Sequence, residues 1–92
     1  MRARELSDFC IQISFLLAAG ISIDGGLSVI AEDALDIKEK EMLLKMSEEV
    51  SEGHSFAVAL EHAGEFPAYV IKMANVGQET GTLESTMKSL AE

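Results

Sequence analysis

The sequence predicts an all-α fold, a compact six-helix bundle made of three helical hairpins. Apolar residues recur at spacings of three and four along nearly the whole chain, which is the period of an amphipathic helix. The 92 residues contain one proline and fit one domain, residues 1–92, with a core from about residue 6 to residue 91. Four Phe, one Tyr and no Trp leave most of the interior to aliphatic side chains and methionine.

The first two helices are separated by a turn at Gly20. The apolar stripe of the first helix ends at this residue, in the position just past a helix end, so we expect Gly20 to have a positive φ. Ser22 is placed to cap a second helix that ends near Asp33. Gly25 and Gly26 lie inside that helix, each at a cost of about 1 kcal/mol relative to alanine. They indicate either close approach of another helix backbone or local flexibility.

Four further helices follow, each bounded by capping and stop residues. Asp36 is placed to cap the third helix, with Glu39 at the third helical position completing a capping box. Proline is favoured in the first turn of a helix, which is where the sequence places Pro67. The third helix is expected to run from Asp36 to Gly53 and the fourth from Ser55 to near Gly64. The fifth has Pro67 in its first turn and carries Gly77, and Thr82 is placed to cap the sixth, in which Leu90 faces inward.

The apolar stripes of these helices predict the core. Cys10 lies on such a stripe and is interpreted as a small buried hydrophobe, since a single cysteine cannot form an internal disulfide. The other residues expected in the core are Leu6, Phe9, Ile13, Leu16, Leu17, Leu27, Ile30, Met46, Val50, Leu60, Val70, Met73 and Met87.

The charge of the chain bears on its partners. Seven basic and sixteen acidic residues give a formal net charge of −9. Such a chain is a poor candidate for nucleic acid, where neutralisation of phosphates supplies most of the affinity. An anionic bilayer surface would also repel it. Basic or neutral proteins are therefore the expected partners.

The sequence contains no recognisable catalytic, metal or cofactor motif. His54 and His62 are eight residues apart and fall on different predicted elements, so they do not form a ligand pair on one helix. The acidic clusters at 32–36 and 48–52 lack the spacing of a calcium loop and are interpreted as solvated helix faces. No nucleophile, base and orienting acid can be assembled from spacing. The chain is predicted not to be an enzyme and to need no cofactor or metal.

A second apolar face distinguishes the first helix. Ile11, Phe15 and Ala18 follow one another at spacings of four and three on a side different from the main stripe. A helix that is apolar over most of its circumference is either central to its own bundle or shared with a partner. The sequence leaves these two interpretations open, and the second predicts a homodimer through Ile11, Phe15 and Ala18.

Three segments carry motifs that identify a family. They span residues 9–27, 50–67 and 77–83. Their distinctive residues are Phe9, Gln12, Leu16, Leu17, Ala19, Gly20, Ile21 and Leu27, then Val50, Gly53, Ser55, Ala59, Leu60, Phe66 and Pro67, and finally Gly77, Thr80, Gly81 and Leu83. Over residues 6–91 the chain resembles the cytoplasmic F domain of the inner-membrane platform proteins of type II secretion and type IV pilus systems. Gln78 stands where this family usually has glutamate, and Glu79 follows it.

The resemblance implies a function for the chain. It would be a non-catalytic scaffold at the cytoplasmic face of the inner membrane, excised from a larger protein that reaches the membrane through segments absent here. It would dock the assembly ATPase and neighbouring platform subunits. The candidate contact is the turn with Gly77, Gln78, Glu79 and Gly81, although its glycines could serve only to end one helix and reverse the chain.

A different class of function is also compatible with the sequence. Residues 20–23 and 53–56 share a Gly-x-Ser-apolar pattern, and a shortened version follows at Gly81. An imperfect repeat of this kind favours a free-standing helical-repeat adaptor that binds a partner protein or peptide.

Overall fold

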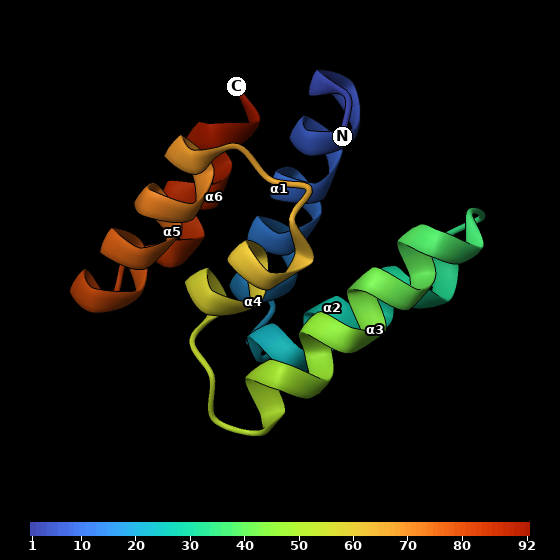
Figure 1. Cartoon of the computed structure of the whole chain (residues 1–92). Coiled ribbons are helices and arrows are strands. Elements are labelled where there is room, and N and C mark those ends of the chain that lie inside the picture. The colour runs from blue at the N-terminus through green and yellow to red at the C-terminus, as the bar shows by residue number, and fades with distance from the viewer.

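The computed structural model describes all of residues 1–92 and consists of six α-helices joined by short connections. The predicted all-α six-helix bundle is confirmed (Figure 1). The helices are α1 (Ala3–Ala18), α2 (Ile23–Asp33), α3 (Ile37–Ser51), α4 (Phe56–Ala63), α5 (Ala68–Thr80) and α6 (Leu83–Ala91).

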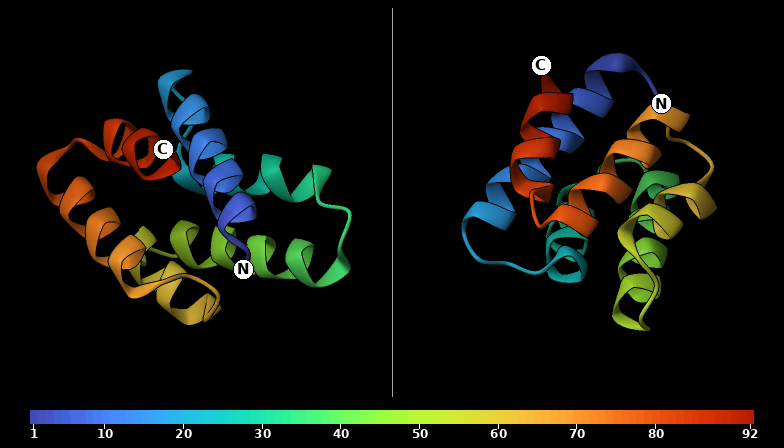
Figure 2. Two further views of the ribbon diagram at one scale, coloured as in Figure 1. Left: turned by 90° about the horizontal axis from the view of Figure 1, so that it is seen from above. Right: turned by 90° about the vertical axis from the view of Figure 1, so that its left-hand side faces the viewer.

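The six helices form a closed ring of contacts. Each helix packs against the next one in the chain, and α6 returns to pack against α1. The most extensive interfaces are those between α1 and α6 and between α2 and α3, so that α1 lies between the α5–α6 pair and the α2–α3 pair (Figure 2). The hydroxyl of Ser7 donates a hydrogen bond to the carbonyl of Ala91, which ties the two ends of the chain together.

Three of the turns use the same backbone motif. Gly20 has a φ of 83°, as expected, and its N–H donates to the carbonyl of Leu17 at 3.0 Å. The N–H of Ile21 donates to the carbonyl of Leu16 at 3.0 Å, which completes a Schellman motif and satisfies the last carbonyls of α1. The turns at Gly53 and Gly81 repeat both hydrogen bonds and the positive φ.

Helix caps agree with the sequence only in part. The Asp36 carboxylate accepts from the N–H of Lys38 at 3.3 Å, and the Ser55 hydroxyl accepts from the N–H of Val58 at 3.1 Å. Ser22 and Thr82 occupy the N-cap positions of α2 and α6 but form no side-chain cap. Pro67 is the residue before α5 rather than a member of its first turn.

The core is one cluster of buried side chains, and most of the predicted core is confirmed. Leu16, Leu17 and Val50 are only partly buried at its edge. Met73 was wrongly placed in it, because α5 turns Val70, Ala74 and Gly77 inward and leaves Met73 45% exposed. The buried residues that form this cluster are Leu6, Phe9, Cys10, Ile13, Leu27, Ile30, Ala31, Leu43, Met46, Phe56, Ala59, Leu60, Phe66, Val70, Ala74 and Met87.

Phe9, which the sequence placed in the core, forms an aromatic cluster there with Phe56 and Phe66, which were not in the predicted core. The ring of Phe9 lies 6.4 Å from that of Phe56 and 5.1 Å from that of Phe66, both in tilted arrangements. Such distances and angles are favourable for aromatic pairs. The cluster joins α1 to α4 and to the segment before α5.

Close approach of another helix backbone, one of the two interpretations of Gly25 and Gly26, is found at Gly77 instead. A Cβ added to Gly26 would meet the side chain of Leu16 at 3.5 Å, and no foreign helix backbone is near it. A Cβ added to Gly77 would lie 2.9 Å from Thr86 Oγ1 and 3.2 Å from the backbone Cα of Leu83. The absence of a side chain at Gly77 is therefore what lets α6 pack directly against α5.

Gly77→Ala is expected to lower the free energy of unfolding by about 1–3 kcal/mol, since the added methyl group overpacks the α5–α6 contact. Gly26→Ala is the matched control, because its methyl group fits at ordinary contact distance and alanine gains up to about 1 kcal/mol of helix propensity. Urea denaturation of both variants measures the difference. A Gly77→Ala variant as stable as the wild type would contradict this account of the contact.

Cys10 provides a probe of core integrity. Its side chain is fully buried, and burial raises the pKa of its thiol to about 11. Because the thiolate is the reactive form, we expect iodoacetamide at pH 8 to label the native chain far more slowly than the chain in guanidinium. Mass spectrometry of timed samples measures both rates. Equal rates would show that Cys10 is accessible in the native state.

Candidate functional site

The structure separates the four residues of the predicted partner-binding turn. Gly77 is buried beneath α6, so it shapes the turn without offering surface to a partner. Gln78, Glu79 and Gly81 are exposed, and Gly81 has a φ of 71° in the Schellman motif that ends α5. The surface that remains available at this turn is that of Gln78, Glu79 and Gly81.

Gln78 also has a role inside the fold. Its Oε1 accepts a hydrogen bond of 3.0 Å from the backbone N–H of Phe56, the first residue of α4. The first N–H groups of a helix have no acceptor within the helix. The Gln78 side chain supplies the acceptor for the N–H of Phe56. An amide oxygen accepts this bond as a carboxylate would, so glutamine at this position preserves the link between α4 and α5.

Side-chain hydrogen bonds fix the geometry of the turn. Thr80 Oγ1 donates to the carbonyl of Val76 at 2.9 Å and lies 2.7 Å from Thr82 Oγ1. The Asn75 amide donates to Glu79 Oε1 at 3.4 Å. Glu79 is therefore held along the surface of α5.

An exposed apolar stripe leads along α5 to this turn. Tyr69, Met73 and Val76 are exposed, and Glu79 follows three residues after Val76. We call Tyr69, Met73, Val76 and Glu79 the α5 face. Spacings of four and three mark these positions in the sequence, but the same spacing led Met73 to be assigned to the core. Periodicity identifies an apolar stripe and does not tell whether the stripe is covered.

The residues predicted for self-association share one side of α1 but differ in exposure. Phe15 is 64% exposed, Ala18 is exposed and Ile11 is partly buried. Phe15 is thus an apolar side chain without cover in the single chain, and the interpretation that this face is central to its own bundle does not apply to it.

The histidines lie together on the surface. The rings of His54 and His62 are 6.2 Å apart, and His62 Nδ1 lies 3.0 Å from Glu49 Oε2. His, Cys, Asp and Glu side chains nowhere gather in a group of three that could hold a metal ion. None of the helices combines the length and the apolar character that crossing a bilayer requires.

Comparison with known proteins finds similar sequences in secretion and pilus assembly systems. A family profile described as "Type II secretion system (T2SS), protein F" matches residues 9–92. The type 4 fimbrial assembly protein PilC of Pseudomonas putida is 29% identical over 94 residues, 98% of this chain and 23% of that protein. The type II secretion system protein F of Xanthomonas campestris pv. campestris is 30% identical over 88 residues, 95% of this chain and 22% of that protein. The chain therefore spans less than a quarter of the length of these relatives.

Proposed function

The chain belongs to the type II secretion system protein F family, and on that premise we propose that it is a non-catalytic scaffold domain of a secretion or pilus platform protein. In this proposal the domain lies at the cytoplasmic face of the inner membrane. It docks the assembly ATPase and neighbouring platform subunits there. Segments of the parent protein outside this chain would supply the membrane spans.

The α5 face is the observation that carries the docking proposal. Met73 and Val76 are 45% and 47% exposed on a helix whose opposite side is packed into the core, and Glu79 adds a charge at its end. An exposed apolar stripe with a charged end is typical of a protein-interaction surface. With a net charge of −9 on the domain, a partner surface with basic residues would be attracted to it.

The closed ring of helices favours the scaffold over the helical-repeat adaptor. In a repeat array each unit contacts only its neighbours, and the terminal units stay apart. Here α6 packs extensively against α1, and Ser7 bonds to Ala91. The chain therefore does not form the open, stackable array of a helical-repeat adaptor.

Glu79→Lys is expected to weaken binding of the assembly ATPase about fivefold, a cost of about 1 kcal/mol, since it reverses the charge that this face would present to a basic partner surface. Isothermal titration calorimetry at low salt measures the affinity, and circular dichroism checks the fold. Glu32→Lys on α2 is the matched control for net charge and should have a smaller effect.

A second pair of variants tests the apolar part of the same face. Val76→Asp should weaken ATPase binding, whereas Leu44→Asp, at a side chain of similar exposure on α3, should leave it unchanged. Unaltered affinity in both Glu79→Lys and Val76→Asp would confine this turn to an architectural role.

We further propose that α1 mediates contact between two copies of the domain. Phe15 is the most exposed phenylalanine, and symmetric pairing is the commonest way to cover such a residue. Ala18 lies one turn away and would let the two helices approach closely.

Phe15→Glu is expected to convert dimer to monomer in analytical ultracentrifugation while its circular dichroism stays helical. Its side chain is mostly exposed, so the substitution adds charge at the interface without disturbing the core. Tyr69→Glu, at an exposed aromatic on α5, is the control and should leave the dimer intact. A wild-type domain that stays monomeric at high concentration would remove this proposal.

A further inference from the structure

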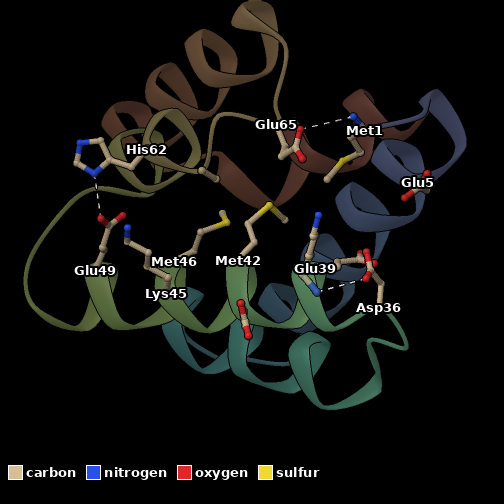
Figure 3. A pocket seen from close by; sticks show the side chains of 13 residues that line it. Met1, Glu5, Asp36, Glu39, Met42, Lys45, Met46, Glu49, His62 and Glu65 are labelled. Carbon is tan, nitrogen blue, oxygen red and sulfur yellow. Dashed lines mark hydrogen bonds and ion pairs between the residues drawn. The ribbon is translucent and has the colours of Figure 1, made fainter.

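A groove runs along α3 on a surface that contains no residue of α5 or α6. One wall is α3 from Asp36 to Glu49, and the other is formed by the start of α1, the end of α4 and the segment that follows it (Figure 3). Its volume is about 490 Å³. Thirteen helical steps at about 1.5 Å each make this wall about 20 Å long, the length of a short helix.

Methionine side chains form the floor of the groove. Met42 and Met46 point into it from α3, and Met1 approaches from the opposite wall (Figure 3). Met46 is buried in the core beneath, whereas Met42 is only partly buried and offers its thioether to the groove. Methionine is flexible and polarizable, so such a floor can adapt to apolar side chains of different shape.

Acidic side chains dominate the rim. Its basic groups are Lys38, Lys45, the ammonium of Met1 and His62. The Met1 ammonium lies 4.0 Å from Glu65 Oε2, and His62 is paired with Glu49. The carboxylates that line the groove are those of Glu5, Asp36, Glu39, Glu41, Glu49 and Glu65. A ligand that fits must combine an apolar side with positive charges on its flanks.

We propose that this groove binds a basic amphipathic helix of a partner protein, with apolar side chains on the methionine floor and Lys or Arg against the acidic rim. A second copy of this chain would fit poorly at this acidic rim because its own net charge is −9, whereas the contact proposed for α1 is through apolar side chains. An anionic bilayer surface would be repelled for the same reason. The surface is distinct from the α5 face, so each can succeed or fail without the other.

The probe for this proposal is a labelled peptide of about 14 residues, made of Leu and Lys in a helical amphipathic pattern. Fluorescence anisotropy with the 92-residue chain should show binding that weakens as salt rises from about 50 to about 500 mM. Amide chemical shifts should change along α3 around Met42 rather than along α5.

Matched variants separate the groove from general charge attraction. Glu5→Gln with Glu39→Gln removes two rim charges and should weaken peptide binding about fivefold. Glu32→Gln with Glu84→Gln removes the same charge from other surfaces and should change binding less than about twofold. Met42→Gln should also weaken it, whereas Met73→Gln, at a methionine of the α5 face, should not.

Three results would overturn the proposal. The first is no binding at about 1 mM peptide, an affinity too weak to be specific. The second is equal loss in the two pairs of glutamine variants, and the third is a set of shifted amides outside the groove. If circular dichroism shows that Met42→Gln is unfolded, the rim variants and the map of shifted amides test the proposal without it. If the rim variants still bind the ATPase, loss of the groove proposal would leave the proposed docking of the ATPase unaffected.

Discussion

The burial of Phe56 is the constraint on which the rest of the bundle depends. Its side chain is fully buried against Phe9 of α1, and its N–H donates to Gln78 of α5. Burial of a phenylalanine contributes about 1.5–3 kcal/mol, and a hydrogen bond contributes about 1 kcal/mol. These are large shares of the stability of so small a domain. One residue therefore connects α4 to the distant helix α1 and to the far end of α5, and it fixes where α4 begins relative to the turn that follows α5.

Closure of the ring depends on a second constraint, the lack of a side chain at Gly77. Because α6 lies against the α5 backbone there, it is placed to reach α1 and to bring Ala91 to Ser7. The Schellman turn at Gly81 supplies the reversal between the two helices. The same few residues thus set both the fold and the geometry of the surface at Glu79, so the shape of that surface is held by packing rather than by the turn alone.

Local sequence signals predicted the positions of the helices well. They did not determine which apolar side chains the other helices bury. Gly20, Asp36 and Ser55 act through neighbouring backbone groups, so spacing alone identified the first turn and two caps. Met73 was misplaced and Phe56 was left out of the predicted core because burial depends on distant partners: Phe9 of α1 packs against Phe56, whereas the neighbouring elements leave Met73 45% exposed. The hydrogen bond between Gln78 and Phe56 joins residues 22 apart in the sequence, so no local pattern predicts it.

The exposed surfaces divide according to charge and apolar content. Phe15 is apolar and the α5 face is apolar except for Glu79 at its end, whereas the α3 groove places several carboxylates around a methionine floor. A partner that buries mainly apolar area loses little affinity when the salt concentration rises. A partner attracted to the groove by charge loses the electrostatic attraction that speeds its association. A scaffold with both kinds of surface can therefore hold one partner firmly and exchange another. The fold permits this because its ring of helices leaves the outer sides of α1, α3 and α5 free at once.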